Sequence, residues 1–558
     1  MKLNGAQILI RTLIEQGVTD IFGYPGGQVL NIYDALYEYR NEINHVLTAH
    51  EQGAAHAADG YSRATGKVGV CLATSGPGAT NLVTGIATAM LDSIPMVAIT
   101  GNVPNALIGK DSFQEIDITG ITLPITKHNF FVKTIDELAD TLREAFLIAK
   151  SGRPGPVLVD IPKDVQVATY EYEPQPVVEK ATLPKVNNDL IKQAIAMIKE
   201  AQRPYIYVGG GAAGLGLGEE IVAFADKIDA AIGCSFMGLS AVPQEDPKFL
   251  GMQGMHGHYA SSMAQDQADL ILAVGVRFSD RATGNVAKFA KSSKIIQLDP
   301  DSAEVNKNVR VQLGLVGDVA DSFKRIAAGC KASKKPAWIA QVNKLKAEEE
   351  LIASEIAQAA KAPLTPKMVF DVINEEKLPK TVIATDVGQH QMWTAQYANF
   401  DGPRRIVSSG GLGTMGFGLG AAIGAYTATK DPVVLITGDG SFGMNLNELA
   451  TAVTYDIPVV IVLMNNGVLG MVRQWQTLFF GKRYSSTILN RKTNFVKLAE
   501  SFGADGYHAE TAVEFRRAFK TAVEKGKTAV IEVCIDKDEL VLPMLPPGGA
   551  ISDMITKV

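Results

Sequence analysis

Short apolar runs alternate with segments of helical hydrophobic spacing along most of the chain. Residues 45–48, 433–436 and 458–464 are examples of the apolar runs, which are typical of strands buried in a parallel sheet. The segments between such runs predict helices that cover the sheets. The whole pattern predicts an α/β fold of doubly wound parallel sheets.

Two stretches rich in proline and charge interrupt this alternation. Residues 170–185 have the composition of a linker, and residues 330–366 contain a second break around a helix-like segment at 338–360. We therefore predict three sheet domains and a short end segment. The predicted bounds are residues 1–170, 188–335 and 365–540, with a C-terminal tail at 541–558.

The first and third predicted domains share one feature of organisation. Each has a glycine-rich loop between a strand and a helix, at residues 74–81 and at residues 409–416. The middle domain has a different signature, the three glycines at residues 209–211 directly after a strand. The sequence thus predicts two similar outer domains and a distinct middle one.

Composition narrows the function classes. The chain has 558 residues, of which 46% are hydrophobic and 20% charged, with a net charge of −6. Large buried cores are therefore expected, and no basic run of the kind that binds nucleic acid is present. The four cysteines form no CxxC pair, so their spacing suggests neither a zinc site nor a disulfide framework, and we expect buried, reduced thiols of a cytosolic protein. They are Cys71, Cys234, Cys330 and Cys534.

The N-terminal segment does not resemble a leader or an anchor. Residues 1–18 have apolar residues at helical spacing, interrupted by Arg11 and Glu15, which predicts an amphipathic surface helix rather than a signal peptide. No apolar run reaches the ~18–20 residues that span a bilayer. We expect no membrane partner and a cytoplasmic location.

The most informative motif is Gly438-Asp439-Gly440-Ser441, which is followed 27 positions after Asp439 by Asn466. This spacing is that of successive strand ends in a βαβ unit, so both side chains are expected at one edge of a parallel sheet. Carboxylate and amide oxygens suit Mg²⁺, and the glycines let a diphosphate approach the backbone. The alternative is an ordinary α/β turn. The pattern resembles the diphosphate signature of thiamine-diphosphate enzymes.

A thiamine cofactor needs a carboxylate beside its aminopyrimidine, on another domain than the diphosphate. Glu51 follows the strand-like residues 45–48 and is therefore expected at a strand end, where ligand sites occur. The alternative is a glutamate favoured at a surface helix N-terminus by the helix dipole. With the diphosphate motif present, we interpret Glu51 as the activating carboxylate.

Motifs along essentially the whole chain are similar to those of acetohydroxyacid synthase, also called acetolactate synthase. Arg281, Gln474-Trp475 and Leu542-Pro543-Met544 are the more specific ones. The motifs are residues 22–27, 50–53, 74–81, 113–115, 125–129, 151–156, 254–257, 275–278, 388–393, 470–475 and 541–544.

This resemblance implies a thiamine diphosphate site with Glu51 at the pyrimidine N1′ and Mg²⁺ held by Asp439, Asn466 and the backbone oxygen of Val468. It places a second group of residues at the border of the reaction space: Gly27, Phe113, Gln114, Lys127 and Met471. The implied cofactor-binding residues are Pro77, Asn81, Val387, Gly388, Gln389, His390, Gly413, Met415, Gly438, Gly440, Ser441, Val468, Leu469 and Gly470.

The resemblance also implies that Arg281 and Trp475 recognise the second 2-keto acid. An arginine offers bidentate donors to a carboxylate, and an indole wall would sense one methylene, worth about 1–3 kcal/mol. The alternatives are an Arg281 pair with Asp280 and a core or interface role for Trp475.

In the middle domain the resemblance implies a structural FAD. The alternative is that these positions are ordinary turn glycines and caps, since a full GxGxxG pattern is absent. The implied residues, with Arg153 from the first domain, are Gly209, Gly210, Gly211, Met237, Gly254, Met255, His256, Gly275, Arg277, Asp299, Glu304, Gly317, Asp318 and Val319.

The implied reaction is decarboxylation of pyruvate on thiamine diphosphate, after which the hydroxyethyl enamine condenses with a second pyruvate or with 2-oxobutyrate. The products are 2-acetolactate and 2-aceto-2-hydroxybutyrate, precursors of valine, leucine and isoleucine. A pyruvate oxidase that uses the same cofactors is the main alternative. A flavin-free acetolactate synthase and a non-catalytic homologue are two others.

The resemblance further implies partners. The site of this family forms between two subunits, so a homodimer or homotetramer is expected. No regulatory module is visible in the chain, and a separate small regulatory subunit is therefore expected.

Overall fold

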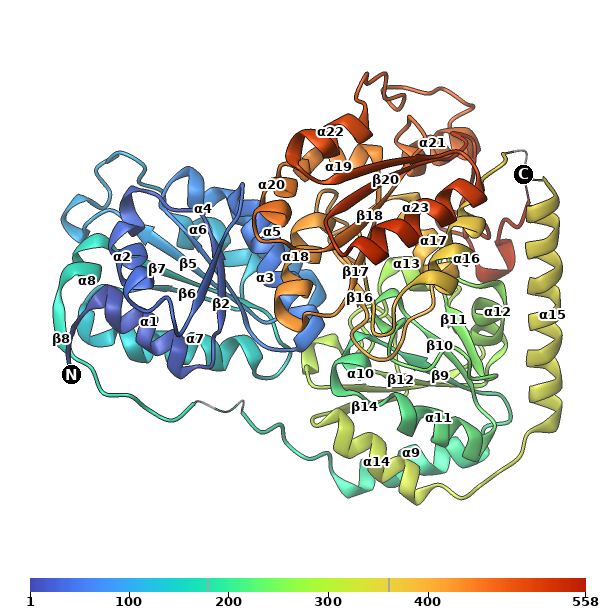
Figure 1. The fold of residues 1–558 in the computed structure, drawn as a ribbon. Coiled ribbons are helices and arrows are strands. Elements are labelled where there is room, and N and C mark those ends of the chain that lie inside the picture. The colour runs from blue at the N-terminus through green and yellow to red at the C-terminus, as the bar shows by residue number, and fades with distance from the viewer. Residues whose placement is uncertain (178, 180, 360–361, 558) are drawn as a thin grey trace.

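Three six-stranded sheets organise the chain. The computed structural model describes residues 1–177, 179, 181–359 and 362–557. Paired strands within each of the three sheets run parallel, and helices lie on both faces (Figure 1). The predicted fold class, three doubly wound α/β domains, is confirmed.

The first and third sheets have the same strand order when their strands are ranked along the chain. The orders are β3-β2-β4-β5-β7-β6 and β16-β15-β17-β18-β20-β19. In both sheets the second strand of the domain forms one edge, and the fifth strand forms the other edge, beside the sixth. The strands are β2 (Asp20–Gly23), β3 (Asn44–Leu47), β4 (Gly69–Ala73), β5 (Met96–Asn102), β6 (His128–Phe131), β7 (Pro156–Pro162), β15 (Val382–Thr385), β16 (Ile406–Val407), β17 (Val433–Gly438), β18 (Val459–Asn465), β19 (Asp505–Ala509) and β20 (Ala529–Cys534).

The middle sheet has the order β11-β10-β9-β12-β13-β14, in which the first three strands run outward to one side and the last three to the other. This is the order of dinucleotide-binding folds, and it differs from that of the outer domains. The strands are β9 (Pro204–Val208), β10 (Ala231–Cys234), β11 (Phe249–Met252), β12 (Leu270–Val274), β13 (Lys294–Asp299) and β14 (Leu313–Val316).

Helices cover both faces of each sheet, and the central strands are apolar on both sides. In β4, Val70 and Leu72 join one buried cluster while Cys71 and Ala73 join another. The larger covering helices are α1 (Gly5–Glu15), α2 (Leu30–Glu38), α3 (Glu51–Thr65), α5 (Val83–Asp92), α7 (Leu138–Lys150), α9 (Asn188–Glu200), α11 (Gly218–Ile228), α12 (Tyr259–Gln267), α14 (Val319–Gly329), α16 (Pro366–Glu376), α17 (Gln389–Tyr397), α18 (Gly418–Thr429), α21 (Gly470–Phe479), α22 (Phe495–Phe502) and α23 (Ala512–Lys525).

Helices α3 and α18 join the first domain to the third, and Figure 1 shows them side by side at the junction. Their backbones approach closely: a Cβ on Gly60 would lie 2.1 Å from the carbonyl oxygen of Ala421, and one on Gly424 would lie 1.8 Å from that of Ala57. Glycine is therefore needed at both crossing points. Arg63 on α3 adds a buried ion pair with Asp92 at 3.0 Å and donates to the Ser408 carbonyl at 2.6 Å.

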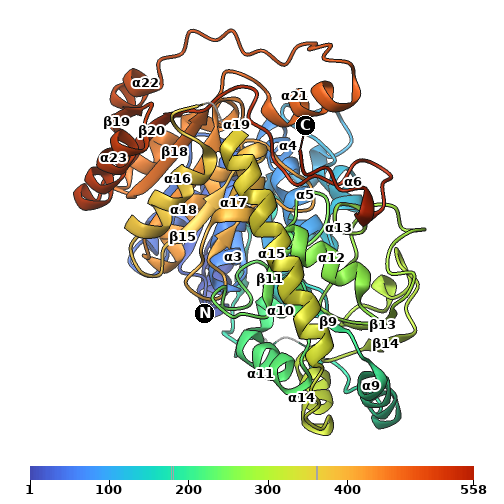
Figure 2. The ribbon, with the colours of Figure 1, turned by 90° about the vertical axis from the view of Figure 1, so that its right-hand side faces the viewer.

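The two predicted linkers contain regular structure. Strand β8 (Thr169–Glu171) pairs with β1 (Lys2–Asn4), so the start of the first linker is part of a small sheet. Helix α15 (Pro336–Ala359) packs along α12 of the middle domain (Figure 2). Its buried Trp338 donates to the Pro204 carbonyl at 3.0 Å. The helix expected at residues 338–360 is thus present, although residue 360 lies outside the described residues.

The N-terminal amphipathic helix is present as α1, with Ile8, Leu9, Ile10 and Leu13 buried. In the described part of the chain, no helix is both long and apolar enough to span a bilayer.

Candidate cofactor and active site

The diphosphate motif lies where the order of the third sheet reverses, between β15 and β17. Asp439 is the first residue of α19 (Asp439–Asn445) and follows Gly438, which is paired in register with Met464 of β18. The Asp439 side chain is buried, and burial raises its pKa to about 6, while the N–H groups of Gly440 and Gly467 act in the opposite direction. A crevice outside the carboxyl ends of parallel strands is the usual ligand position in such sheets.

Asn466 lies beside Asp439 at this edge, directly after β18. Its amide donates to Gln389 Oε1 at 3.3 Å, and its Oδ1 accepts from the Val468 N–H at 3.1 Å. Gly467 between them has φ +67°, a conformation that favours glycine. The turn therefore presents a side-chain oxygen and the backbone of Val468 on one short segment.

The end of β15 contributes a third wall. Gln389 begins α17 and donates to the Glu539 carbonyl at 2.8 Å. His390 is buried, its Nε2 has no hydrogen-bond partner among the described residues, and burial lowers its pKa to about 3. A neutral imidazole with a buried nitrogen left over can bond a ligand, because an unsatisfied buried polar atom is costly. Ser441 Oγ donates to the Val387 carbonyl at 2.8 Å, which ties the two strand ends together.

The glycine-rich loop at residues 409–416 reaches the same edge. Gly413 and Gly416 have φ of +69° and +85°, and Gly416 donates to the buried Asp386 carboxylate at 2.8 Å. The Met415 Cε lies 3.8 Å from where a Cβ on Gly440 would be. Asp92 of the first domain accepts from the N–H groups of Gly410 and Gly411. The structure therefore places the predicted residues Val387 to His390, Gly413, Met415 and Gly438 to Ser441 at one carboxyl edge of the third sheet, and we refer to this group of residues as the diphosphate crevice.

Residues 468–470 lead into α21 on the other side of this crevice. Gly470 approaches Gln389: a Cβ there would lie 2.0 Å from Gln389 Oε1. Leu469 Cδ2 would lie 2.9 Å from a Cβ on Gly440. The predicted positions Val468, Leu469 and Gly470 are thus brought to the diphosphate crevice.

Glu51 begins α3 at the carboxyl end of β3, as predicted. Its carboxylate accepts a hydrogen bond from Asn81 at 2.9 Å, and it lies 3.3 Å from where a Cβ on Gly78 would be. Pro77 begins the short helix α4 (Pro77–Asn81), which carries Asn81. Within the part of the chain that the structure describes, no hydrogen bond or ion pair joins Glu51 to Asp439 or Asn466.

Other residues predicted at the reaction space lie on separate loops of the first domain. Gly27 begins a short 3₁₀ turn after β2, and its carbonyl accepts from Lys163 at 3.3 Å. Phe113 is 84% exposed. Gln114 has φ +61° and lies against Gly76. These three share the carboxyl edge of the first sheet with Glu51.

Lys127 does not lie at that edge. It precedes β6, and its N–H donates to the Pro156 carbonyl at the amino end of β7. Its ammonium donates to the carbonyls of Ile148 and Ser151, where α7 ends. Burial, with repulsion from Arg153, lowers its pKa to about 8. Within one chain the structure therefore groups Lys127 with Arg153 rather than with Glu51.

Of the two predicted acceptor residues, Arg281 has the partner that the alternative interpretation named. Arg281 lies 3.8 Å from Asp280 and is 65% exposed, and Trp475 on α21 packs edge-on against Phe479 at 5.6 Å. Arg281 also donates to Met255 Sδ at 3.4 Å. Met471 lies on the same helix as Trp475 and is half-buried.

The C-terminal tail connects helix α21, which carries Trp475, with the loop of Met255 beside Arg281. Gln474 of α21 donates to the Val541 carbonyl at 3.0 Å and contacts Met544 Sδ at 3.3 Å. Leu545 donates to the Met255 carbonyl at 2.7 Å. Because Met255 contacts Arg281, the tail brings the helix of Trp475 into the neighbourhood of Arg281.

All of the predicted flavin residues of the middle domain follow the carboxyl ends of its six strands. Glycines at the reversal point allow close backbone approach: a Cβ on Gly209 would lie 2.0 Å from the Gly275 carbonyl oxygen. Gly209, Gly210 and Gly211 follow β9, Met237 follows β10, and Gly254, Met255 and His256 follow β11. On the other side of the sheet, Gly275 and Arg277 follow β12. Asp299 ends β13 and Glu304 follows it, while Gly317, Asp318 and Val319 follow β14.

This middle edge contains charged and unsatisfied groups that suit a polar ligand. Burial raises the pKa of Asp299 to about 6, and burial together with Arg153 lowers the pKa of Arg277. In the part of the chain that the structure describes, His256 Nδ1 and both amide atoms of Gln253, Nε2 and Oε1, are buried without a hydrogen-bond partner. Arg153 reaches the edge from the first domain and pairs with Glu304 at 2.7 Å. Asp318, by contrast, caps α14 through Asp321.

Several residues of these sites carry no sequence signal that predicts them. Glu448 is fully buried and accepts from the Ala49 N–H, two residues before Glu51. Asp92 and Asp386 hold the glycine-rich loop, yet each stands in an ordinary apolar segment of the sequence. One prediction is wrong: Cys534 is not buried, because it ends the strand beside the edge strand.

Comparison with known proteins gives matches over all three domains. Residues 3–121 match the thiamine pyrophosphate enzyme N-terminal TPP binding domain, residues 191–326 the central domain of these enzymes, and residues 386–533 the C-terminal TPP binding domain.

Curated relatives match along the full length. The acetolactate synthase isozyme 2 large subunit of Escherichia coli is 45% identical over an alignment of 566 positions, which covers 100% of both chains. The probable acetolactate synthase large subunit of Methanocaldococcus jannaschii is 45% identical, over 100% of this chain and 96% of that one. The acetolactate synthase large subunit of Corynebacterium glutamicum is 43% identical, over 99% and 90%.

Proposed function

The chain belongs to the acetolactate synthase large subunits within the thiamine pyrophosphate enzymes, and we propose that it condenses pyruvate with a second pyruvate or with 2-oxobutyrate, using thiamine diphosphate, Mg²⁺ and FAD. The family resemblance seen in the sequence is confirmed. The observation that carries this proposal is the strand-end edge at the reversal point of the third sheet, where Asp439, Asn466 and His390 lie on neighbouring turns.

Thiamine diphosphate is the cofactor that the matched domains bind. When bound, it supplies the C2 carbanion that attacks a keto carbon. We propose that the N–H groups at the start of α17 and α21 and the His390 Nε2 hold the diphosphate, since helix N-termini favour anions. Met415 would support the thiamine beside Gly440. Glu51 would contact the pyrimidine N1′ and hold the proton that favours the reactive tautomer.

Mg²⁺ is proposed at Asp439, Asn466 and the Val468 carbonyl. Support comes from the donor set, which is oxygen only, and from the burial of Asp439, whose raised pKa records the cost of its negative charge. A divalent cation would remove that cost. The same cation would neutralise part of the charge of a diphosphate in the crevice.

FAD is proposed at the carboxyl edge of the middle sheet. Support comes from the strand order, which is that of dinucleotide-binding folds, and from the glycines at its reversal point. Arg153 and Arg277 would face the phosphates, and the unsatisfied His256 and Gln253 would gain hydrogen bonds. Asp299 would accept from a ribose hydroxyl.

For the second 2-keto acid we propose Arg281 as the carboxylate donor and Trp475 as the wall that senses the side chain. Arg281 is mostly exposed, its ion pair with Asp280 is long at 3.8 Å, and its other contact is the Met255 sulfur, so its guanidinium is available for a bidentate contact. The connection through the tail from Met255 to Gln474 supports a common pocket.

A second copy of the chain is proposed to complete the site. Glu51 and the diphosphate crevice belong to different domains, and among the described residues no hydrogen bond or ion pair joins Glu51 to Asp439 or Asn466. A homodimer would bring the Glu51 of one chain to the crevice of the other, and a homotetramer would contain two such dimers. Relatives are named large subunits, which supports a separate small subunit. A cytoplasmic location is proposed with this biosynthetic role.

Product analysis tests the proposal. The purified protein is given pyruvate, thiamine diphosphate, Mg²⁺ and FAD under air, with 2-oxobutyrate in half of the samples. We expect 2-acetolactate alone and a mixture with 2-aceto-2-hydroxybutyrate, respectively, and neither product with Glu51→Gln. Acetate or acetyl phosphate with stoichiometric peroxide would contradict the proposal and indicate an oxidase.

A further inference from the structure

Four polar side chains, those of His508, Glu510, Glu532 and Cys534, lie together on one face of the third sheet, at its outer edge. Strands β19 and β20 are parallel neighbours, and their register pairs His508 with Glu532 and Ala509 with Val533. Ala509 and Val533 are buried in the core on one face. Successive side chains of a strand alternate between faces, so His508, Glu532 and Cys534 lie on the other face, and Glu510, the residue directly after β19, lies beside them.

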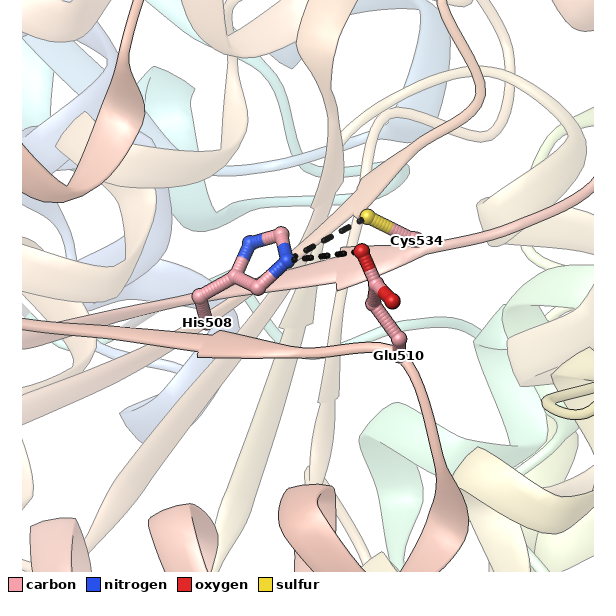
Figure 3. A group of neighbouring side chains, drawn as sticks. All are labelled: His508, Glu510 and Cys534. Carbon is pink, nitrogen blue, oxygen red and sulfur yellow. Dashed lines mark hydrogen bonds and ion pairs between the residues drawn. The ribbon is translucent and has the colours of Figure 1, made fainter.

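Three of these side chains present potential metal ligands to one another (Figure 3). His508 Nε2 lies 3.3 Å from Glu510 Oε1 and 4.0 Å from Cys534 Sγ, and the three ligand atoms all lie within 4.8 Å of one another. Tetrahedral Zn²⁺ with bonds of about 2.0–2.3 Å holds such atoms roughly 3.3–3.8 Å apart. Small side-chain rotations therefore suffice to close the site.

The fourth side chain orients the histidine. Glu532 Oε2 lies 3.1 Å from His508 Nδ1, and its other oxygen accepts from Asn465 at 2.7 Å. A carboxylate that accepts the Nδ1 proton fixes the tautomer in which Nε2 has a free lone pair. Metal-binding histidines nearly always have such a partner. The neighbouring Asn465 fixes the carboxylate in turn, so the arrangement extends beyond chance proximity of three exposed groups.

We propose that His508, Glu510 and Cys534 bind one Zn²⁺ ion, with Glu532 as the positioning residue behind the histidine and solvent in the fourth position. The nitrogen, sulfur and oxygen ligands favour zinc or a similar borderline cation over Mg²⁺ and Ca²⁺, which take oxygen ligands. The site is independent of the proposed Mg²⁺ position, which contains no thiol.

The ion would join the edge strand to its neighbour. Edge strands are held on one side only, and β19 is the last strand of this sheet. Asn465, which fixes Glu532, directly precedes the Asn466 of the diphosphate crevice. Zinc would therefore stabilise the sheet edge next to the cofactor crevice, in proportion to its free concentration.

Cobalt titration of the full-length protein, with thiamine diphosphate and Mg²⁺ present, tests the site. A Co²⁺ ion bound by a thiolate gives a charge-transfer band in the near ultraviolet, which an all-oxygen site cannot give. We expect this band with wild type and with Cys330→Ser, a control at a buried cysteine elsewhere. We expect no band with Cys534→Ser.

Zinc affinity, measured by competition with a chromophoric chelator, separates the roles of the side chains. Glu532→Gln should weaken zinc binding by about 10–100-fold, which is the usual effect of removing a carboxylate that is hydrogen-bonded to a metal-binding histidine. His508→Gln and Glu510→Gln should weaken it further, and both positions are exposed enough to tolerate the change. Absence of the cobalt band in wild type, or equal zinc affinity in wild type and Cys534→Ser, would overturn the proposal.

Discussion

The carboxylate of Glu448, on the third domain, accepts a hydrogen bond from the backbone N–H of Ala49, on the first, at 3.1 Å. Ala49 lies two residues before Glu51, and Thr451 also donates to this carboxylate at 2.6 Å. A Cβ on Gly53 would lie 2.0 Å from Glu448 Oε1, so α3 begins directly against it. The third domain thus fixes the start of the helix that carries Glu51.

Replacing Glu448 by alanine should disturb the position of Glu51. We expect Glu448→Ala to lower the free energy of unfolding by about 1–3 kcal/mol, since the Ala49 N–H loses its partner. A small shift of Glu51 can reduce kcat by as much as about 100-fold. Glu448→Gln keeps an acceptor oxygen and should retain most of both. Steady-state kinetics and thermal unfolding measure these effects, with the exposed Glu500→Ala as control. Wild-type kcat in Glu448→Ala would contradict the positioning role.

Removing the charge of Asp439 should weaken Mg²⁺ binding. We expect Asp439→Asn to raise the Mg²⁺ concentration for half-maximal activity by more than about 100-fold. Loss of a residue that only supports a metal ligand weakens metal binding by roughly 10–100-fold, and Asp439 is proposed as a ligand itself. Thiamine diphosphate binding, measured by calorimetry at a fixed Mg²⁺ concentration, should weaken in parallel. Asp456→Asn changes an exposed aspartate before the next strand and should leave both unchanged. An unaltered Mg²⁺ requirement in Asp439→Asn would place the metal elsewhere.

Flavin retention should depend on Arg277. Burial and Arg153 both disfavour the charge of its guanidinium, and an anionic ligand would relieve this. A charge-assisted hydrogen bond contributes about 1.5–3 kcal/mol, so Arg277→Met should weaken FAD binding by about 10–150-fold. The flavin absorbance of the dialysed protein gives the occupancy. The exposed Arg310→Met is the control, and equal occupancy in both variants would argue against flavin at this edge.

The buried Asp160 should make stability depend on pH. Its oxygens accept from Thr100 at 2.7 Å and Asn102 at 2.6 Å, but burial dominates and raises its pKa from 3.8 to about 7. Because the pKa is higher in the folded state, the folded protein binds the Asp160 proton more tightly than the unfolded chain does. The stability that this preference contributes is complete below pH 3.8. It is lost as pH rises through 7, by up to about 1.4 kcal/mol per pH unit.

Thermal unfolding at several pH values checks this prediction. Between about pH 5 and pH 7, wild type should lose stability relative to Asp160→Asn, which cannot ionise. The exposed Asp136→Asn should follow the wild-type dependence. A constant difference between wild type and Asp160→Asn over this range would show that the carboxyl is already ionised in the folded protein.

Positions at strand ends could be predicted from the sequence, because parallel strands bring their carboxyl ends to one edge. Asp439 and Asn466 lie at the same sheet edge for this reason, and so do the turns that follow the six strands of the middle domain. Lys127 could not be placed, since its position depends on the order of β6 and β7 in the sheet. Glu448 was missed because a glutamate between helices has no periodic signal. The His508 and Cys534 pair depends on strand register, which the sequence pattern leaves open.

The carbon balance of the reaction tests the central claim most directly. The protein is given pyruvate alone, under air and without oxygen, and the CO₂ released is measured against the pyruvate consumed. We predict one CO₂ for every two pyruvates under both conditions, with no oxygen uptake, because one pyruvate is decarboxylated and the other is the acceptor. One CO₂ for each pyruvate, with matching oxygen uptake, would contradict the synthase and favour the oxidase.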